Sequence, residues 1–176
     1  HIQKFYHKLR TKLEYIYCDS NNLTTLDLRA SKDIRGVSTS NSASMVAIYL
    51  SEDIGGDISV DSWTTVIRDG ENPNINFKDP EAKQYCINNW DANGDLELSL
   101  DEANTITSLP RCNEDIESFR ELLLFSSLKD VEDEAFAGCA KLQDILLPSS
   151  LERVGDFSFA NTNITGISLP QSVASI

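Results

Sequence analysis

The apolar positions of residues 128–176 follow one pattern that occurs twice, and a third copy begins at Val173 and Ile176. Equivalent positions keep a constant spacing through the first half of the pattern and a slightly shorter one through the second half, as these pairs show: Leu128 and Leu151, Val131 and Val154, Phe136 and Phe159, Cys139 and Thr162, Leu142 and Ile164, Ile145 and Ile167, Leu147 and Leu169, Pro148 and Pro170. Self-similarity at this period is typical of repeat proteins, in which each unit buries its apolar face against a neighbour.

Each copy predicts one short strand and one bend. The strands are predicted over residues 145–148 and 167–170, and each ends at a proline that cannot donate the next hydrogen bond. The bends carry Phe136 and Phe159, which are large enough to fill the interior on the far side of a repeat. We therefore expect these two phenylalanines to occupy equivalent positions in successive repeats.

The combined pattern, L-x-x-V-x-x-x-x-F-A-x-C/T-x-x-L-x-x-I-x-L-P, resembles the leucine-rich repeat of the bacterial surface proteins called BspA-like. The resemblance implies an α/β repeat fold, a leucine-rich repeat solenoid with short parallel strands. In such a fold, residues 107–127 form an irregular first coil whose apolar positions are Ile116, Phe119, Leu122, Leu123 and Phe125.

A second, degenerate array is predicted before residue 68. Residues 13–23 match the general template L-x-x-L-x-L-x-x-N/C-x-L, with Asn21 expected to satisfy backbone groups where the chain turns inward. A weaker copy follows directly, with Ser42 at the asparagine position. Ile58 and Ile67 fall out of register, so residues 51–67 are interpreted as a closing strand or two.

Residues 1–12 place Ile2, Phe5 and Leu9 at helical spacing, with basic residues around the other side. The pattern predicts an amphipathic helix that covers the open end of the first array, since the first unit of an array needs a cap. Contact with a membrane surface is the alternative interpretation.

The middle of the chain predicts a linker and a helix. Residues 68–78 are rich in turn formers, and Asp79 followed by Pro80 is typical of a helix start. The helix would present one face, formed by Ala82, Tyr85, Cys86, Asn89 and Trp90. The predicted domains are residues 1–67 (helix and degenerate repeats), 68–78 (linker), 79–108 (helical module) and 109–176 (regular repeats, ending within a repeat).

Oxygen-bearing side chains recur after this helix at the spacing of an EF-hand calcium loop. Asp91, Asn93, Asp95, Ser99 and Glu102 occupy loop positions 1, 3, 5, 9 and 12, and Glu97 would contribute its backbone carbonyl. Leu98 is the apolar residue expected to anchor the loop to the core. A single such loop ahead of repeats also resembles BspA-like proteins, which implies that this helical module caps the second array.

One residue departs from the EF-hand pattern. Position 6 normally holds glycine, because the backbone there has a positive φ, and this chain has Leu96. A left-handed leucine costs about 1 to 2 kcal/mol. The prediction is therefore a weak, structural calcium site, and the alternative is a degenerate loop that binds no metal.

The net charge of the chain excludes one class of partner. The chain has 28 acidic and 15 basic residues and a net charge of −13, which argues against nucleic acid, since that partner needs a cationic surface. Cys18 and Cys139 are expected to be inward-facing fillers, whereas pairing of Cys86 with Cys112 stays open. The chain starts without methionine and stops inside a repeat, so we expect it to be part of a longer protein whose export signal or anchor lies elsewhere.

No enzymatic activity is predicted, because both histidines, His1 and His7, lie in the first segment and no catalytic motif occurs. Outward positions of the strands are the expected partner-binding residues, and their alternative role is ordinary solvated surface: Tyr15, Tyr17, Asp19, Asp144, Leu146, Thr165 and Ser168. The resemblance implies a secreted or cell-surface protein that binds a protein or glycan. The alternative is a passive spacer or accessory module of a larger secreted protein.

Overall fold

The computed structural model describes residues 4–5 and 13–175. The chain divides into two compact units, His1–Asn76 (unit 1) and Phe77–Ile176 (unit 2). The division falls inside the stretch 68–78, for which the sequence predicts a linker. Ile75, just before the division, is buried, and the backbone N–H of Asn76 donates to Oγ1 of Thr65 at 2.9 Å, so this stretch packs onto unit 1.

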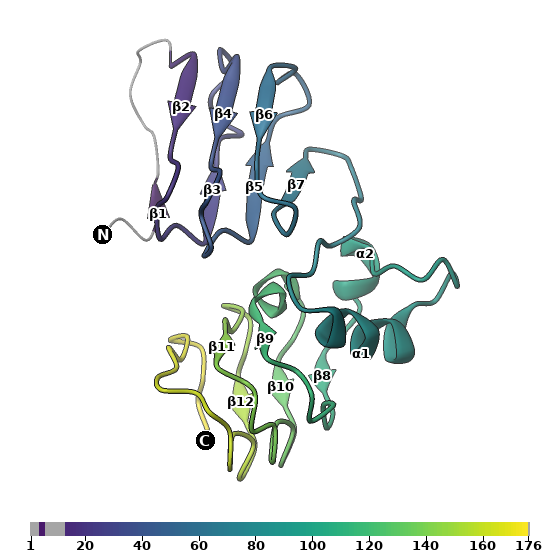
Figure 1. The fold of residues 1–176 in the computed structure, drawn as a ribbon. Helices are drawn as coiled ribbons and strands as arrows, with labels where there is room; N and C mark the ends of the chain where they lie inside the picture. The colour runs from purple at the N-terminus through teal and green to yellow at the C-terminus, as the bar shows by residue number, and fades with distance from the viewer. Residues whose placement is uncertain (1–3, 6–12, 176) are drawn as a thin grey trace. The chain divides into compact units, whose positions relative to one another are not determined.

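Unit 1 consists of parallel strands that alternate between two sheets along the chain (Figure 1). One sheet has the order β1 (Lys4–Phe5), β3 (Thr25–Asp27), β5 (Ala47–Leu50) and β7 (Thr65–Arg68). The other has the order β2 (Tyr15–Tyr17), β4 (Gly36–Ser38) and β6 (Asp57–Ser59). Each repeat therefore contributes one strand to each sheet, and the apolar side chains between the sheets form the core.

The register of these strands corrects one prediction. Ile58 pairs with Val37 in the β4–β6 pair, and Ile67 pairs with Tyr49 in the β5–β7 pair, so residues 51–67 continue the repeats. The sequence spacing hides only the register of β7, because the last loop is shorter: Val66 follows its partner Ile48 more closely in the chain than Ile48 follows its own partner Leu26. Ile58, by contrast, follows Val37 at the same spacing at which Val37 follows Ile16. The prediction that one or two strands occur here is confirmed.

The predicted N-terminal helix is wrong where the structure describes it. Lys4 and Phe5 form β1, which pairs in parallel with Thr25 and Leu26 of β3. A strand at this position supplies hydrogen bonds to the edge of β3, which a helix cannot do. The rest of the predicted helix, residues 1–3 and 6–12, lies outside the described residues.

Unit 2 begins with the predicted helix and continues into short parallel strands (Figure 1). Helix α1 (Pro80–Trp90) starts where predicted, and Oδ1 of its cap Asp79 accepts the backbone N–H of Glu81 at 2.9 Å. Helix α2 (Leu100–Ala103) follows the acidic loop. The remaining elements form the sheets β12-β10-β8 and β11-β9: β8 (Ser108–Leu109), β9 (Ser118–Phe119), a 3-10 helix (Arg120–Leu124), β10 (Asp130–Val131), β11 (Asp144–Ile145) and β12 (Arg153–Val154).

The equivalence of the two C-terminal copies is confirmed. Val131 pairs with Val154 across β10 and β12, and the rings of Phe136 and Phe159 stack with centroids 5.2 Å apart and planes 7° apart. Phe119 extends this aromatic column into the irregular first coil, since its ring meets that of Phe136 edge-on at 6.5 Å. Phenylalanines from successive repeats therefore pack directly on one another.

The strands form four separate sheets in the described residues rather than the predicted solenoid. Of the two predicted C-terminal strands, only Asp144–Ile145 forms, and residues 167–170 form none. Much of the bonding between these repeats instead joins their bends, where backbone N–H groups of Glu134 and Phe136 donate to the carbonyls of Asp156 and Ser158. Successive repeats can therefore stack through hydrogen bonds between their bends, even where their strands are very short.

Several predicted interior residues have different surroundings. Asn21 is exposed and does not satisfy the inward turn as predicted. Ser42 of the next repeat satisfies backbone groups there instead: its buried hydroxyl donates to the Cys18 carbonyl and accepts the Asn21 N–H. Asn89 is exposed on α1, while Ala82, Tyr85 and Cys86 are buried. Cys18 is half-buried and Cys139 fully buried, and Cys86 and Cys112 are separate free thiols.

Candidate binding face and calcium loop

The outward residues of β2, β4 and β6 form a surface that we call the tyrosine face: Tyr15, Tyr17, Gly36, Ser38, Asp57 and Ser59. Ile16 points inward between the two tyrosines and is buried. Tyr15 and Tyr17 are 52% and 75% exposed, and their rings lie parallel with centroids 6.5 Å apart. Strand alternation therefore places two large aromatic side chains side by side in solvent.

Small residues beside the tyrosines keep this face open. Tyr15 pairs with Gly36 of β4, and a Cβ atom at Gly36 would lie 2.9 Å from Cδ1 of Tyr15, so only glycine lets the ring rest over β4. Tyr17 is in register with Ser38, which in turn pairs with Ser59. Hydroxyl groups and a glycine thus occupy the strands next to the aromatic pair.

Asp19 lies in the turn after β2, beside this face. Its Oδ1 accepts the Ser38 hydroxyl at 2.5 Å and the backbone N–H of Ser40 at 2.8 Å. The equivalent turn after β6 carries Asp61, whose two carboxylate oxygens accept the backbone N–H groups of Asn41 and Ser42. Both carboxylates are therefore held by the neighbouring repeat at the carboxyl ends of the strands.

The other predicted partner-binding residues lie in unit 2 and are less available. Oδ2 of Asp144 lies 3.2 Å from Nη1 of the buried Arg120, and Leu146 is half-buried. Thr165 and Ser168 are exposed in a stretch without strands. The structure therefore does not join these residues into a face comparable with the tyrosine face.

A loop joins α1 to α2 (Figure 1). Its carboxylates turn toward its own backbone. Asp91 accepts the N–H groups of Gly94 at 2.8 Å and Leu96 at 2.9 Å, one with each carboxylate oxygen. Oδ1 of Asn93 accepts the N–H of Asp95, and Oδ1 of Asp95 accepts the N–H of Glu97. The oxygens at positions 1, 3 and 5 are thus held inside one compact loop.

Glu102 closes the loop from its far end. Its Oε2 accepts both the backbone N–H and the hydroxyl of Ser99, and its Oε1 accepts the N–H of Ala92 at 3.0 Å. The Ser99 hydroxyl also accepts the N–H of Glu102, which completes a capping box at the start of α2. Hydrogen bonds from Ser99 lower the pKa of the Glu102 carboxyl, so it is ionised at neutral pH.

Leu96 adopts the backbone conformation that an EF-hand requires at position 6. Its φ is +63°, and its side chain is 69% exposed, whereas Leu98 two residues later is fully buried. Glu97 directs its side chain away from the loop, since its Oε1 lies 2.6 Å from Nζ of Lys83 on α1. The loop therefore has the predicted turn and anchor, and Leu96 carries the predicted strain.

The loop oxygens fit a hard cation in type, because calcium prefers carboxylate, amide and carbonyl oxygens. Among the described residues, however, no three His, Cys, Asp or Glu side chains gather into a group that could hold a metal. The physical reason is that the carboxylates of Asp91, Asp95 and Glu102 accept loop N–H groups. Binding would require them to turn part of their oxygens toward one point.

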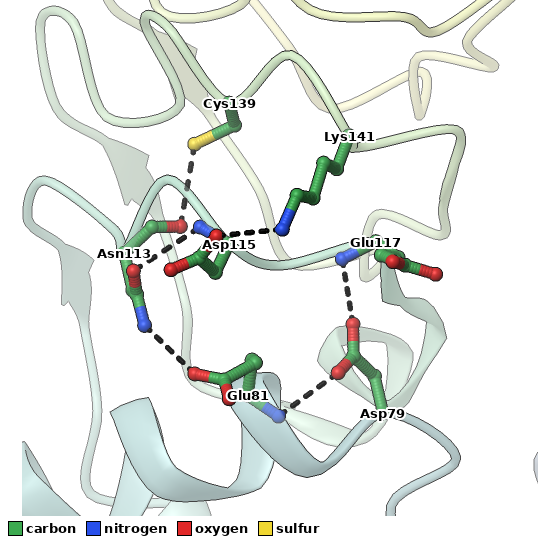
Figure 2. Close-up of polar contacts among 7 residues, drawn as sticks. All are labelled: Asp79, Glu81, Asn113, Asp115, Glu117, Cys139 and Lys141. Atoms are coloured by element: carbon green, nitrogen blue, oxygen red, sulfur yellow. Dashed lines mark hydrogen bonds and ion pairs between the residues drawn. The ribbon is translucent and has the colours of Figure 1, made fainter.

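A pocket that sequence reasoning missed lies where α1 meets the repeats of unit 2 (Figure 2). It has a volume of about 500 Å³ and is lined by Asp79, Pro80, Glu81, Asp115, Glu117 and Lys141. Oδ2 of Asp79 accepts the backbone N–H groups of Glu117 and Ser118 at 2.6 and 2.9 Å. No pattern in the sequence indicates this contact, because 38 residues separate Asp79 from Glu117.

The polar groups of this pocket are largely engaged with one another. Nζ of Lys141 donates to Oδ1 of Asp115 at 2.8 Å, which raises the lysine pKa, and Nδ2 of Asn113 donates to Glu81 at 3.0 Å. Figure 2 shows these contacts together with those that join Asp79 to Glu81 and Glu117. The arrangement fastens the start of α1 to the repeats, which is a structural role.

No described helix is long and apolar enough to cross a membrane. A search of curated proteins found no match to the chain, and a search of solved structures found none either. Residues 110–176 match the family model described as BspA type Leucine rich repeat region (6 copies). This part of the chain is therefore similar to BspA-type leucine-rich repeats.

Proposed function

We propose that this protein is a non-catalytic binding module of a secreted or surface-displayed BspA-like protein, and that the tyrosine face of unit 1 contacts a protein partner. The observation that carries the proposal is the exposure of Tyr15 and Tyr17 side by side on one strand. Aromatic side chains of this size are enriched at the centres of protein interfaces. Covering each ring would contribute roughly 2 to 3 kcal/mol to binding.

The chemistry of the buried thiols supports a non-catalytic role. Burial raises the pKa of Cys86 and Cys112 well above that of a free thiol. A buried thiol that stays protonated is a poor nucleophile. The pocket near Lys141 likewise offers polar groups that are already paired, so neither feature favours an enzyme.

Capture of partners from bacterial or host surface extract tests this role. The immobilised parent chain is expected to retain a protein that the Tyr15→Ser/Tyr17→Ser variant retains at least tenfold less, since the variant loses both rings without a change of net charge. Phe157→Ser is the matched control, because Phe157 is as exposed as Tyr17, at 75%, and lies in unit 2. Equal capture by all three chains contradicts the tyrosine face, and no capture by the parent favours a passive spacer.

We also propose that residues 91–102 bind calcium weakly. The specific observation is the left-handed backbone of Leu96 at the glycine position of an otherwise matching loop. Asp91, Asn93, Asp95, Ser99 and Glu102 would supply side-chain oxygens, and Glu97 its carbonyl. Bound calcium would fix the connection between α1 and α2.

Melting of the purified chain tests the calcium proposal. With calcium at ten times the dissociation constant, the linkage gain is about 1.4 kcal/mol, which raises the Tm of unit 2 by roughly 5 to 10 °C relative to chelator. Glu102→Gln is expected to abolish this shift, because the amide cannot act as a bidentate carboxylate but still accepts hydrogen bonds within the capping box.

Leu96→Gly provides the opposite change. Relief of about 1 to 2 kcal/mol of backbone strain is expected to raise stability with or without calcium, and to strengthen calcium binding if the turn tightens around the ion. An identical Tm in millimolar calcium and in chelator, for the parent and for Leu96→Gly, would contradict calcium binding.

A further inference from the structure

We propose that the occupant of the tyrosine face is an extended, arginine-bearing peptide segment of the partner, with one guanidinium over each tyrosine ring. This inference rests on the proposed function, because it names the partner chemistry of that same face. It is carried by the charge of the face, the spacing of its rings and the contrast with the other sheet of unit 1.

The tyrosine face carries negative charge without a compensating cation in the described residues. Asp57 lies on the face itself, and Asp19 and Asp61 lie in the turns that follow β2 and β6. Among the described residues, Arg35 directly precedes β4, and its guanidinium is paired with the carboxylate of Glu14 at 3.6 Å. Aromatic faces and carboxylates both attract cations, and the surface therefore complements a basic segment.

The other sheet of unit 1 also combines a tyrosine ring with a carboxylate, and there an arginine of the same chain already binds both groups. Cζ of Arg29 lies 5.1 Å from the centroid of the Tyr49 ring, and its guanidinium pairs with Asp27 at 2.5 Å. Tyr49 is consequently only half-exposed. The tyrosine face has the rings and the carboxylates of this arrangement, but within residues 13–175 no arginine is paired over these rings as Arg29 is over Tyr49, and a partner can supply one.

The spacing of the rings favours an extended peptide. Alternate residues of an extended chain lie about 6.6 Å apart, and the centroids of Tyr15 and Tyr17 lie 6.5 Å apart with nearly parallel planes. A segment that runs along β2 therefore places side chains i and i+2 over successive rings. Ser38 and Ser59, the small residues in register with Tyr17, leave space beside the rings for its backbone.

Arginine suits this face better than lysine. A guanidinium is planar, so it can stack on a tyrosine ring while its remaining N–H groups donate to a carboxylate such as Asp57. The ammonium group of lysine is strongly hydrated and has no flat face. A neutral oligosaccharide could also stack on the rings, but it would not use the carboxylates as counter-charges.

Titration of the full chain with synthetic peptides tests this inference. The probe is a labelled peptide of alternating arginine and threonine, and the comparison peptides replace arginine with lysine or glutamine or place arginine at every third position. Measured by fluorescence anisotropy, the alternating arginine peptide is expected to bind at least tenfold more tightly than the glutamine peptide and several-fold more tightly than the other two. Binding should weaken as salt rises.

Charge-neutral variants separate the tyrosine face from general attraction to an acidic protein. Tyr15→Ser/Tyr17→Ser is expected to lower the peptide affinity at least tenfold, Tyr15→Phe/Tyr17→Phe to preserve it within about threefold, and Phe157→Ser to leave it unchanged. Asp57→Asn, which removes one negative charge from the face, should lower the affinity and reduce its salt dependence. Equal affinity of the parent and the serine variant would overturn the inference.

Two further outcomes distinguish this inference from the proposed function. If extract capture depends on Tyr15 and Tyr17 but the arginine peptide does not bind, the face is an interface for another chemistry and only the arginine inference is overturned. If a soluble oligosaccharide binds in a tyrosine-dependent way and the peptide does not, the occupant is a glycan and the inference is again overturned.

Discussion

Replacing Phe119 with alanine is expected to lower the free energy of unfolding of unit 2 by about 3 to 5 kcal/mol. Phe119 is fully buried, and its ring meets those of Phe125, Tyr85 and Phe136 edge-on at centroid distances of 5.9, 6.3 and 6.5 Å. Truncation removes the ring that joins α1 to the repeat column and leaves a cavity that its neighbours cannot fill. Urea unfolding followed by Trp90 fluorescence measures this loss.

Trp90 is a suitable reporter because its ring contacts Tyr85 and Phe125. The chain has two tryptophans, and Trp63 lies in unit 1, so a Trp63→Phe background isolates the unfolding of unit 2. Phe157→Ala is the matched control, since this exposed ring should change stability by no more than about 0.5 kcal/mol. A similar shift of the urea midpoint for both alanine variants would contradict the aromatic column as the core of unit 2.

The C-terminal half of the fold could be predicted because its pattern is local and repeated. Phe136 and Phe159 occur at the same place in two copies, so stacking repeats must bring them together. The start of α1 could be predicted for a similar reason, since the cap at Asp79 and the proline after it act within one turn. Phe119 also fell among the expected apolar positions, although its edge-on contacts depend on the irregular coil.

The N-terminal repeats were harder to predict because their very short strands leave little periodicity. Phe5 fits helical spacing in the sequence, yet the backbone around it pairs with β3. Val66 follows its strand partner Ile48 unusually closely in the chain, because a loop shortened outside the strands changes the period without changing the pairing. Pairing in a parallel sheet is decided between repeats, which the sequence of one repeat does not contain.

Some features of the candidate sites could also be predicted from local sequence patterns, and others could not. The loop of residues 91–102 could be located from spacing, and the positive φ at Leu96 follows from its place in that pattern. The outward direction of Tyr15 and Tyr17 follows from strand alternation. The engagement of Asp144 by Arg120 could not be predicted, because Arg120 comes from the 3-10 helix of the irregular coil and the two residues are distant in the sequence.

The second large expected effect is a loss of stability of unit 1 when Gly56, one of two adjacent glycines in the turn before β6, is replaced with alanine. Gly56 packs against the backbone of Arg35, and a Cβ atom there would overlap the Arg35 carbonyl and lie 2.7 Å from its Cα. The Arg35 backbone cannot move away freely, since its carbonyl accepts the N–H of Asp57 at 3.0 Å and its N–H donates to the carbonyl of Glu14. At Gly55, by contrast, an added Cβ would have nothing within 4 Å.

Gly56→Ala is therefore expected to destabilise unit 1 by at least about 3 kcal/mol, whereas Gly55→Ala should stay within about 1 kcal/mol of the parent. Fluorescence of Trp63 in a Trp90→Phe background, followed through urea unfolding, measures both changes. Similar midpoints for the two alanine variants would contradict the close packing of successive repeats at Arg35. Because the same contact sets β6 beside β4, Gly56→Ala should also weaken binding at the tyrosine face, although Gly56 lies outside that face.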